Sequence, residues 1–137
     1  MVLGEKLWEG KAKTQSMTIK GVSSEGMTFE HTWSADVKGI GKAKGFDGNI
    51  FETETAIVTS TGAATAQGNA MFNLYTGETA FIKAQGFGRG EGQHGMGLYV
   101  WSFVTNAEKL AWLNGTLAIV TQDGEPQQFD LTIWEWK

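Results

Sequence analysis

The chain of 137 residues carries 11 Lys or Arg and 15 Asp or Glu, a net charge of −4, and has an isoelectric point near 5.1. It contains no cysteine, which excludes disulfides, thiolate metal sites and a nucleophilic cysteine. The acidic balance argues against a nucleic-acid partner, because phosphates are bound by basic surfaces, and there is no run of about 18 apolar residues that would predict a membrane helix.

Residues 1–137 are expected to form one domain, because no linker or low-complexity tract divides them. The first residues lack the apolar core and cleavage pattern of a signal peptide. Together with the absence of cysteine, this leads us to expect a cytoplasmic protein. The 19 glycines and single proline fit a chain with many turns and bulges.

Alternating apolar and polar residues predict β-strands joined by tight turns such as Thr61-Gly62, Thr76-Gly77 and Asp123-Gly124. The first two strands are long enough to contain a bend or bulge. A short helical segment over 106–113, with Asn106 as its cap, precedes the last two strands. The predicted fold is all-β: an antiparallel, eight-stranded, up-and-down barrel with one short helical turn. The strands are expected near 5–20, 26–41, 49–60, 63–75, 78–89, 95–105, 115–122 and 127–137.

The register of the middle hairpin follows from the length of its loop. A two-residue loop at 61–62 pairs Phe51 with Phe72, which gives one apolar face of mostly small residues that we expect to point inward. Such residues either leave free volume in a narrow barrel or merely let the sheet coil tightly. A three-residue loop would reverse the assignment, because a slip of one residue moves every side chain to the other face. The expected inner face comprises Phe51, Thr53, Thr55, Ile57, Ala64, Ala66, Gly68, Ala70, Phe72 and Leu74, and the other face carries Glu52 and Glu54.

The same rule applied to the loop at 76–77 pairs Phe72 with Phe81. It places Phe81, Lys83, Gln85 and Phe87 on the inner face. A lysine inside an apolar barrel is costly unless it is paired, so Lys83 is a candidate functional residue. The alternative is that Lys83 lies near a barrel end and reaches water with its ammonium group.

His31 shares strand parity with Trp33, Ala35 and Val37, which places it on an apolar face. It is either a core histidine satisfied by a neighbour or a pocket histidine that moves a proton near neutral pH. His94 lies in a glycine-rich loop that is expected to border a barrel mouth. With two histidines and no His-Glu-x-x-His spacing, no metal site is expected, and no glycine cluster has the context of a phosphate loop.

The chain has six tryptophans, and one strand is apolar on both faces. Tyr99, Trp101 and Phe103 line one face of that strand. Such a strand is covered on both sides, by the barrel core and by a neighbouring subunit. Alternatively, some of these rings hold an apolar or planar ligand. The second face carries Met96, Leu98 and Val100.

Two stretches resemble the small bacterial barrels grouped with allene oxide cyclase and dirigent proteins. Residues 35–43, Ala-Asp-Val-Lys-Gly-Ile-Gly-Lys-Ala, resemble their acidic Gly-x-Gly strand, and residues 106–117 look like their late turn. Asn114 stands where an arginine often lies, and the lead-in glycines are missing. The resemblance implies a calycin-like eight-stranded barrel. It transfers no catalytic residue, and because the plant members form trimers it implies a homo-oligomer.

Three functional hypotheses are compatible with these observations. The first is a soluble barrel that binds a small, largely apolar molecule in its cavity, oriented by His31 and Lys83. The second is a cofactor-independent cyclase or isomerase in which His31 or Lys83 moves a proton. The third is a structural or assembly protein with a solid core. None of the three includes a cofactor, nucleic acid or a membrane. The expected ligand contacts are Trp33, Phe72, Phe81, Tyr99 and Trp101.

Overall fold

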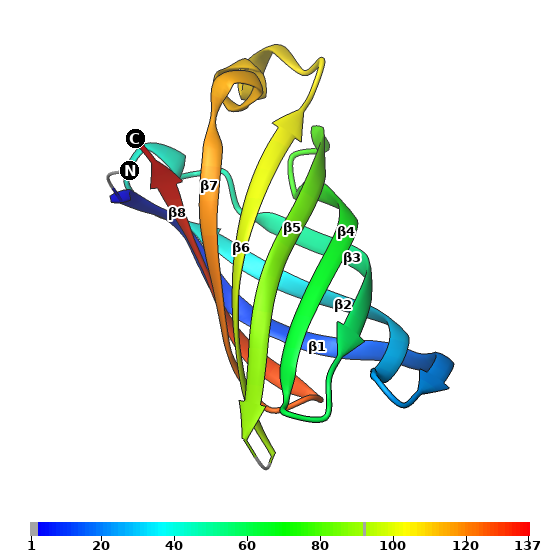
Figure 1. The fold of residues 1–137 in the computed structure, drawn as a ribbon. Helices are drawn as coiled ribbons and strands as arrows, with labels where there is room; N and C mark the ends of the chain where they lie inside the picture. The colour runs from blue at the N-terminus through cyan, green and yellow to red at the C-terminus, as the bar shows by residue number, and fades with distance from the viewer. Residues whose placement is uncertain (1–2, 92) are drawn as a thin grey trace.

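The computed structural model describes residues 3–91 and 93–137 and shows a closed antiparallel barrel whose eight strands follow one another in chain order (Figure 1). This confirms the predicted fold class. Every strand end lies within three residues of its predicted position. The strands are β1 (Leu3–Ser23), β2 (Gly26–Gly39), β3 (Gly48–Val58), β4 (Ala63–Leu74), β5 (Thr79–Glu91), β6 (His94–Val104), β7 (Leu117–Gly124) and β8 (Gln128–Trp136).

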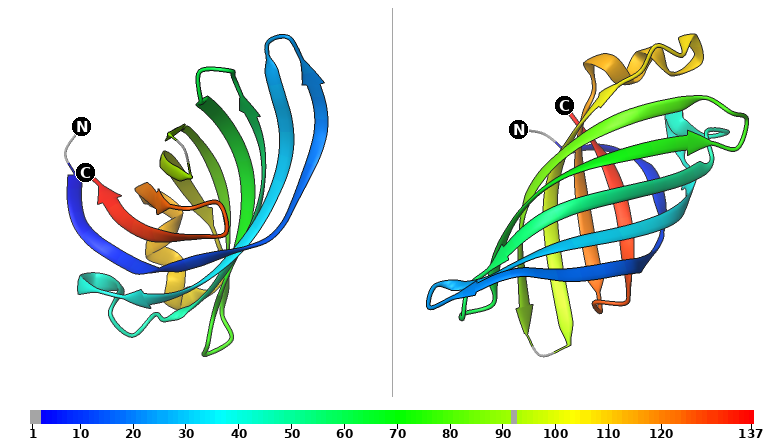
Figure 2. Two further views of the ribbon diagram at one scale, coloured as in Figure 1. Left: turned by 90° about the horizontal axis from the view of Figure 1, so that it is seen from below. Right: turned by 90° about the vertical axis from the view of Figure 1, so that its right-hand side faces the viewer.

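Strand β1 closes the barrel because it pairs with both β2 and β8. Its ladder with β8 ends at Lys13, opposite Gln128, and its later residues pair with β2 alone. The register with β2 shifts between Thr14 and Ser16 and again further along the strand, which confirms the bulge expected in the first strand. No such shift occurs between β2 and β3. Because the later residues of β1 have no neighbour in β8, the tip of the β1–β2 hairpin projects beyond the barrel (Figures 1 and 2).

Two short 3-10 helices interrupt the strands: η1 (Gly41–Ala43) and η2 (Glu108–Gly115). The second lies at the predicted helical turn, but the expected cap is wrong, because the residue that precedes η2 is Ala107 and makes no side-chain cap. Asn114 instead ties the two ends of this segment together. Its side chain accepts from the N–H of Thr105 at 2.8 Å and donates to the carbonyl of Thr105 at 3.0 Å. In the described part of the chain, neither helix is long and apolar enough to cross a membrane.

The end of the barrel next to η2 is filled by aromatic side chains. Trp8 packs edge-to-face on Phe72 with ring centroids 5.1 Å apart, and Trp112 stacks on Trp8 at 5.9 Å. The indole N–H of Trp8 donates to the carbonyl of Phe46 at 2.9 Å, so this buried polar group is satisfied. A cavity lies at the opposite end, where the β3–β4, β5–β6 and β7–β8 turns are found (Figure 1).

The β3–β4 loop has three residues, 60–62, and the predicted two-residue loop is wrong. The N–H of Gly62 donates to the carbonyl of Thr59 at 3.0 Å, the N–H of Thr59 donates to that of Ala63 at 2.9 Å, and Gly62 has a φ of 86°. This is a turn followed by a left-handed glycine, a common three-residue hairpin loop.

The ladder is consequently shifted by one residue, and Phe72 pairs with Ile50 instead of Phe51. The predicted inner face of β4 is correct, but the two faces of β3 are exchanged. Phe51 is 45 % exposed, whereas Glu52 and Glu54 are buried. Two carboxyl groups thus point into the barrel where the sequence predicted threonines.

The β4–β5 loop repeats this geometry over residues 75–77. The N–H of Gly77 donates to the carbonyl of Leu74 at 2.9 Å, and Gly77 has a φ of 107°. Phe72 pairs with Ala80, so the predicted pairing with Phe81 is wrong. Phe81 is 57 % exposed and Lys83 is also exposed. Neither faces the interior, and Lys83 reaches water from the outer surface of β5.

The third predicted turn, Asp123-Gly124, lies within β7 and not in the loop. The β7–β8 turn is formed by residues 125–128. Glu125 and Gln128 exchange backbone hydrogen bonds of 2.9 and 3.2 Å across it. Pro126 is therefore at the tip of this turn, where its carbonyl is available to the neighbouring β1.

Candidate binding site in the open half of the barrel

A cavity of about 410 Å³ opens at the end of the barrel that carries the β3–β4, β5–β6 and β7–β8 turns. Small side chains from β3 and β4, including Ala56, Ala64 and Ala66, form part of its wall and leave the space. His94 lines the rim of the cavity, as expected for a mouth residue, with Nε2 2.6 Å from Asp123 Oδ1. The inward polar side chains are His31, Glu54, Tyr99 and Gln122.

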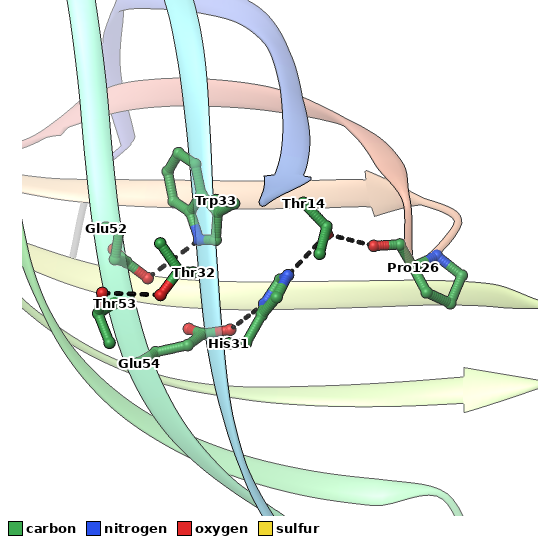
Figure 3. A network of polar contacts seen from close by, with 8 residues as sticks. All are labelled: Thr14, His31, Thr32, Trp33, Glu52, Thr53, Glu54 and Pro126. Atoms are coloured by element: carbon green, nitrogen blue, oxygen red, sulfur yellow. Dashed lines mark hydrogen bonds and ion pairs between the residues drawn. The ribbon is translucent and has the colours of Figure 1, made fainter. Parts of the chain in front are cut away.

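His31 is held at both ring nitrogens (Figure 3). Nε2 lies 2.7 Å from the hydroxyl of Thr14, and Nδ1 lies 3.1 Å from Glu54 Oε1. The Thr14 hydroxyl also donates to the carbonyl of Pro126. A hydroxyl has one proton to donate, so Thr14 must accept from His31, and Nε2 of His31 carries a hydrogen.

Because Nε2 carries a hydrogen, the contact between His31 Nδ1 and Glu54 Oε1 requires one further proton. If the imidazole is neutral, Nδ1 is an acceptor and the proton is on Glu54 Oε1; if the imidazole is charged, Glu54 is a carboxylate. In both states one proton lies on the line between Nδ1 and Oε1. His31 and Glu54 therefore share one proton inside the barrel, and the Thr14 hydroxyl links His31 to Pro126 in the β7–β8 turn.

Glu52 is fully buried two residues before Glu54 on the same face of β3. Its Oε1 accepts from the indole N–H of Trp33 at 3.2 Å (Figure 3). Burial raises the pKa of Glu52 well above its ordinary value, and the negative charge of Glu54 raises it further. Burial thus favours the protonated, uncharged form of the Glu52 carboxyl group, which avoids a second buried charge in the barrel.

Tyr99 reaches the same cavity from β6 across two glycines. A Cβ added to Gly86 would lie 2.4 Å from Tyr99 Cδ2, and one added to Gly97 would lie 2.8 Å from Cε1. These positions need glycine because the tyrosine ring occupies the space of a side chain. Burial, assisted by the nearby carboxyl groups of Glu54 and Glu52, raises the pKa of the Tyr99 phenol, so the Tyr99 hydroxyl keeps its proton and can donate a hydrogen bond at neutral pH.

The predicted site residues lie in different parts of the barrel. His31 and Tyr99 line the cavity. Trp33 and Trp101 are fully buried and stack on each other at 6.4 Å, outside the set of lining residues. Phe72 belongs to the filled end. The predicted interior positions of Phe81 and Lys83 are wrong because the β4–β5 loop is one residue longer than assumed.

Three residues of the site are not among those predicted from the sequence: Glu54, Gln122 and Thr14. Glu54 was assigned to the outer face by the register error on β3. The signal that indicates the correct register is Gly62, because a glycine that ends a hairpin loop is typical of the three-residue form. Among residues 3–91 and 93–137, no group of three or more His, Cys, Asp and Glu side chains is placed to hold a metal ion.

The fold and the cavity define the class of protein: a closed eight-stranded antiparallel β-barrel with one half filled and the other open. No protein-family model and no curated protein matches the chain. A protein of unknown function from Clostridium acetobutylicum ATCC 824 has the same fold, with a TM-score of 0.83 and 15% identity over 100% of both chains.

Two further solved structures are similar over most of their length. A β-barrel-like protein from Acinetobacter baumannii AYE has a TM-score of 0.82 at 17% identity and covers 99% of this chain and 96% of that one. An enzyme from Penicillium herquei has a TM-score of 0.75 at 17% identity, and the match covers 97% of this chain and 92% of that one. At such low identity the likeness shows the β-barrel fold alone.

Proposed function

We propose that this barrel binds a small, largely apolar molecule in its open half. The observation that carries the proposal is the cavity of about 410 Å³, whose wall combines small apolar side chains with a few inward polar groups. Ligand pockets typically have volumes of about 300–1,000 Å³ and this mixture of lining groups. The apolar wall would supply the affinity, and the polar groups would orient the ligand.

Filling part of the cavity is expected to weaken binding while leaving the barrel folded. Ala66 lines the cavity and is nearly fully buried, so Ala66→Leu places three extra carbon atoms in the space of the ligand. We expect the affinity for methylnaphthalene, an apolar probe of suitable size, to fall at least about tenfold, because even a methylene-sized misfit in a hydrophobic pocket changes affinity by about that factor. The affinity is measured by isothermal titration calorimetry.

The matched control is Thr65→Leu, which adds bulk to the outer face of the same strand. This variant should bind the probe as the unaltered protein does. Unchanged affinity in Ala66→Leu, with folding verified by circular dichroism, would place the binding site elsewhere.

A second candidate function is proton transfer to and from a substrate in the cavity. It is favoured by one observation: Glu54 faces the cavity with Oε1 bound to His31 and with Oε2 lacking a partner among the described residues. Both nitrogens of His31 are engaged, so we assign contact with substrate to Glu54. His31 then positions the carboxyl group and shares its proton. The neighbour from Penicillium herquei is described as an enzyme.

If the barrel is such an enzyme, Glu54→Gln should lower its turnover at least about a hundredfold, since a positioned acid–base group contributes that much or more. The assay follows isomerisation of an unconjugated cyclic enone by the ultraviolet absorbance of its conjugated product. Glu125→Gln, at the exposed rim of the same cavity, should retain turnover. Full activity in Glu54→Gln would remove this residue from the mechanism, and an unaltered protein without activity would leave ligand binding alone.

We also propose, from the sequence resemblance, a relationship to the calycin-like barrels of the allene oxide cyclase and dirigent group. Residues 1–137 would form one cytoplasmic domain with neither nucleic acid nor a membrane as partner. The proposal of a homo-oligomer is supported by apolar side chains on the outer face of β6, where Met96 and Leu98 are about half exposed. Subunit contacts would cover such a surface.

A further inference from the structure

Two polar atoms in the cavity lack hydrogen-bond partners. Within the part of the chain that the structure describes, Glu54 Oε2 and Gln122 Nε2 are buried and have no partner at hydrogen-bonding distance and angle, although Tyr99 and Glu52 lie near enough to Glu54 for its carboxyl group to raise their pKa values. Both residues line the cavity, and the side chain of Glu54 is only 6 % exposed. Buried polar atoms are almost always hydrogen-bonded in native proteins, so these two atoms indicate where a ligand supplies the missing partner.

The two atoms approach the cavity from opposite walls. Glu54 is on β3 and Gln122 is on β7, and four steps around a closed barrel of eight strands separate these strands. Gln122 lies next to Tyr99, because a Cβ added to Gly97 would be 3.6 Å from Gln122 Cβ and 2.8 Å from Tyr99 Cε1. A ligand group that pairs with both atoms must therefore lie in the lumen between the two walls.

The chemical character of each atom is fixed. Gln122 Nε2 belongs to an amide N–H₂ and donates. Glu54 Oε2 accepts in both states of the His31–Glu54 pair, since the shared proton is on Oε1 or on Nδ1 and never on Oε2. The ligand must therefore donate to one wall of the cavity and accept from the other.

We propose that the ligand of this barrel bears a neutral hydroxyl group that donates to Glu54 Oε2 and accepts from Gln122 Nε2. This inference rests on the proposed function, and it names the polar group of the apolar ligand. A hydroxyl oxygen donates and accepts at a single atom. A carboxylate supplies no donor and would face the buried glutamates, and an ammonium group supplies no acceptor, so each leaves one atom unpaired.

The test compares naphthalene derivatives of nearly the same shape: methylnaphthalene, naphthylmethanol, naphthamide, naphthoate and naphthylmethylammonium. Calorimetric titration of the unaltered protein should show naphthylmethanol binding at least about tenfold more tightly than methylnaphthalene, as expected for two hydrogen bonds to buried partners. Naphthoate and naphthylmethylammonium should bind more weakly than the alcohol. This ranking needs no variant and is independent of any effect on folding.

A variant then locates the contact. Gln122→Met removes the donor at nearly constant size, and we expect the preference for the alcohol over methylnaphthalene to fall by about fivefold or more. Gln85→Met makes the same substitution on the exposed outer face of β5 and should leave the preference unchanged.

The outcomes separate the two proposals. If neither methylnaphthalene nor naphthylmethanol binds, the proposed function fails. If both bind with equal affinity, the cavity binds apolar molecules and only the hydroxyl assignment is overturned. Tighter binding of naphthamide, naphthoate or naphthylmethylammonium than of the alcohol overturns the assignment in favour of that group, and an unchanged preference in Gln122→Met overturns the role of Gln122.

Discussion

The Glu52→Gln variant is expected to be more stable than the unaltered protein at neutral pH. The folded state raises the pKa of Glu52 above the 4.5 of an unperturbed glutamate, mainly through burial and further through the charge of Glu54. Below pH 4.5 the carboxyl group is protonated in the folded and unfolded states alike, and it contributes no pH dependence. Above that pH the unfolded chain releases a proton that the folded chain keeps, so stability falls as pH rises towards the folded-state pKa.

Glutamine cannot ionise, so the variant lacks this component of the pH dependence. Within the window above pH 4.5, the folding equilibrium constants of the two proteins should diverge by up to about tenfold per pH unit. Urea unfolding at a series of pH values between about 4 and 8 measures the effect. Glu25→Gln, on the exposed β1–β2 turn, should not diverge from the unaltered protein in this way. A variant whose stability parallels that of the unaltered protein at all pH values would show that folding does not raise the pKa of Glu52.

Truncating Phe72 is expected to cost far more stability than truncating Phe81. Phe72 is fully buried against Trp8, whereas Phe81 is 57 % exposed on the outer face of β5. Phe72→Ala should lower the free energy of unfolding by about 3–5 kcal/mol, through lost burial and the cavity that is left. Phe81→Ala should change it by no more than about 0.5 kcal/mol. The difference is measured by denaturant unfolding at constant pH.

Phe72→Leu, a smaller truncation, covers the case in which the alanine variant does not fold. Because Phe72 belongs to the filled end and not to the cavity wall, the leucine variant should bind methylnaphthalene as the unaltered protein does. A large loss of affinity with little loss of stability would restore the interpretation of Phe72 as a ligand contact. Similar stability losses in Phe72→Ala and Phe81→Ala would contradict the observed register of β4 and β5.

Within a strand, alternation was sufficient to group residues by face. The apolar parity that contains His31 and Trp33 points inward on β2, and the parity of Tyr99 and Trp101 points inward on β6. The same patterns predict the eight-stranded barrel, and every observed strand end lies within three residues of its predicted position. These predictions succeed because the faces of a strand depend on a period of two residues, which is local.

Between strands, the prediction depended on loop length and was wrong twice. Gly62 and Gly77 both adopt positive φ at the end of three-residue loops. Each loop is one residue longer than predicted, and this extra residue exchanges the inner and outer faces of one strand of the hairpin relative to the other. Phe51, Phe81 and Lys83 were therefore placed inside although they are outside. For the same reason Glu54, which becomes central to the candidate site, was placed outside.

The number and order of the strands and the closed antiparallel architecture are predictable from the sequence, since they follow from short-range alternation and turn residues. The filled half of the barrel and the contact between His31 and Glu54 are evident only once the strands are assembled. Those features depend on how strands distant in sequence are aligned, and that alignment changes by a whole face when one loop gains one residue.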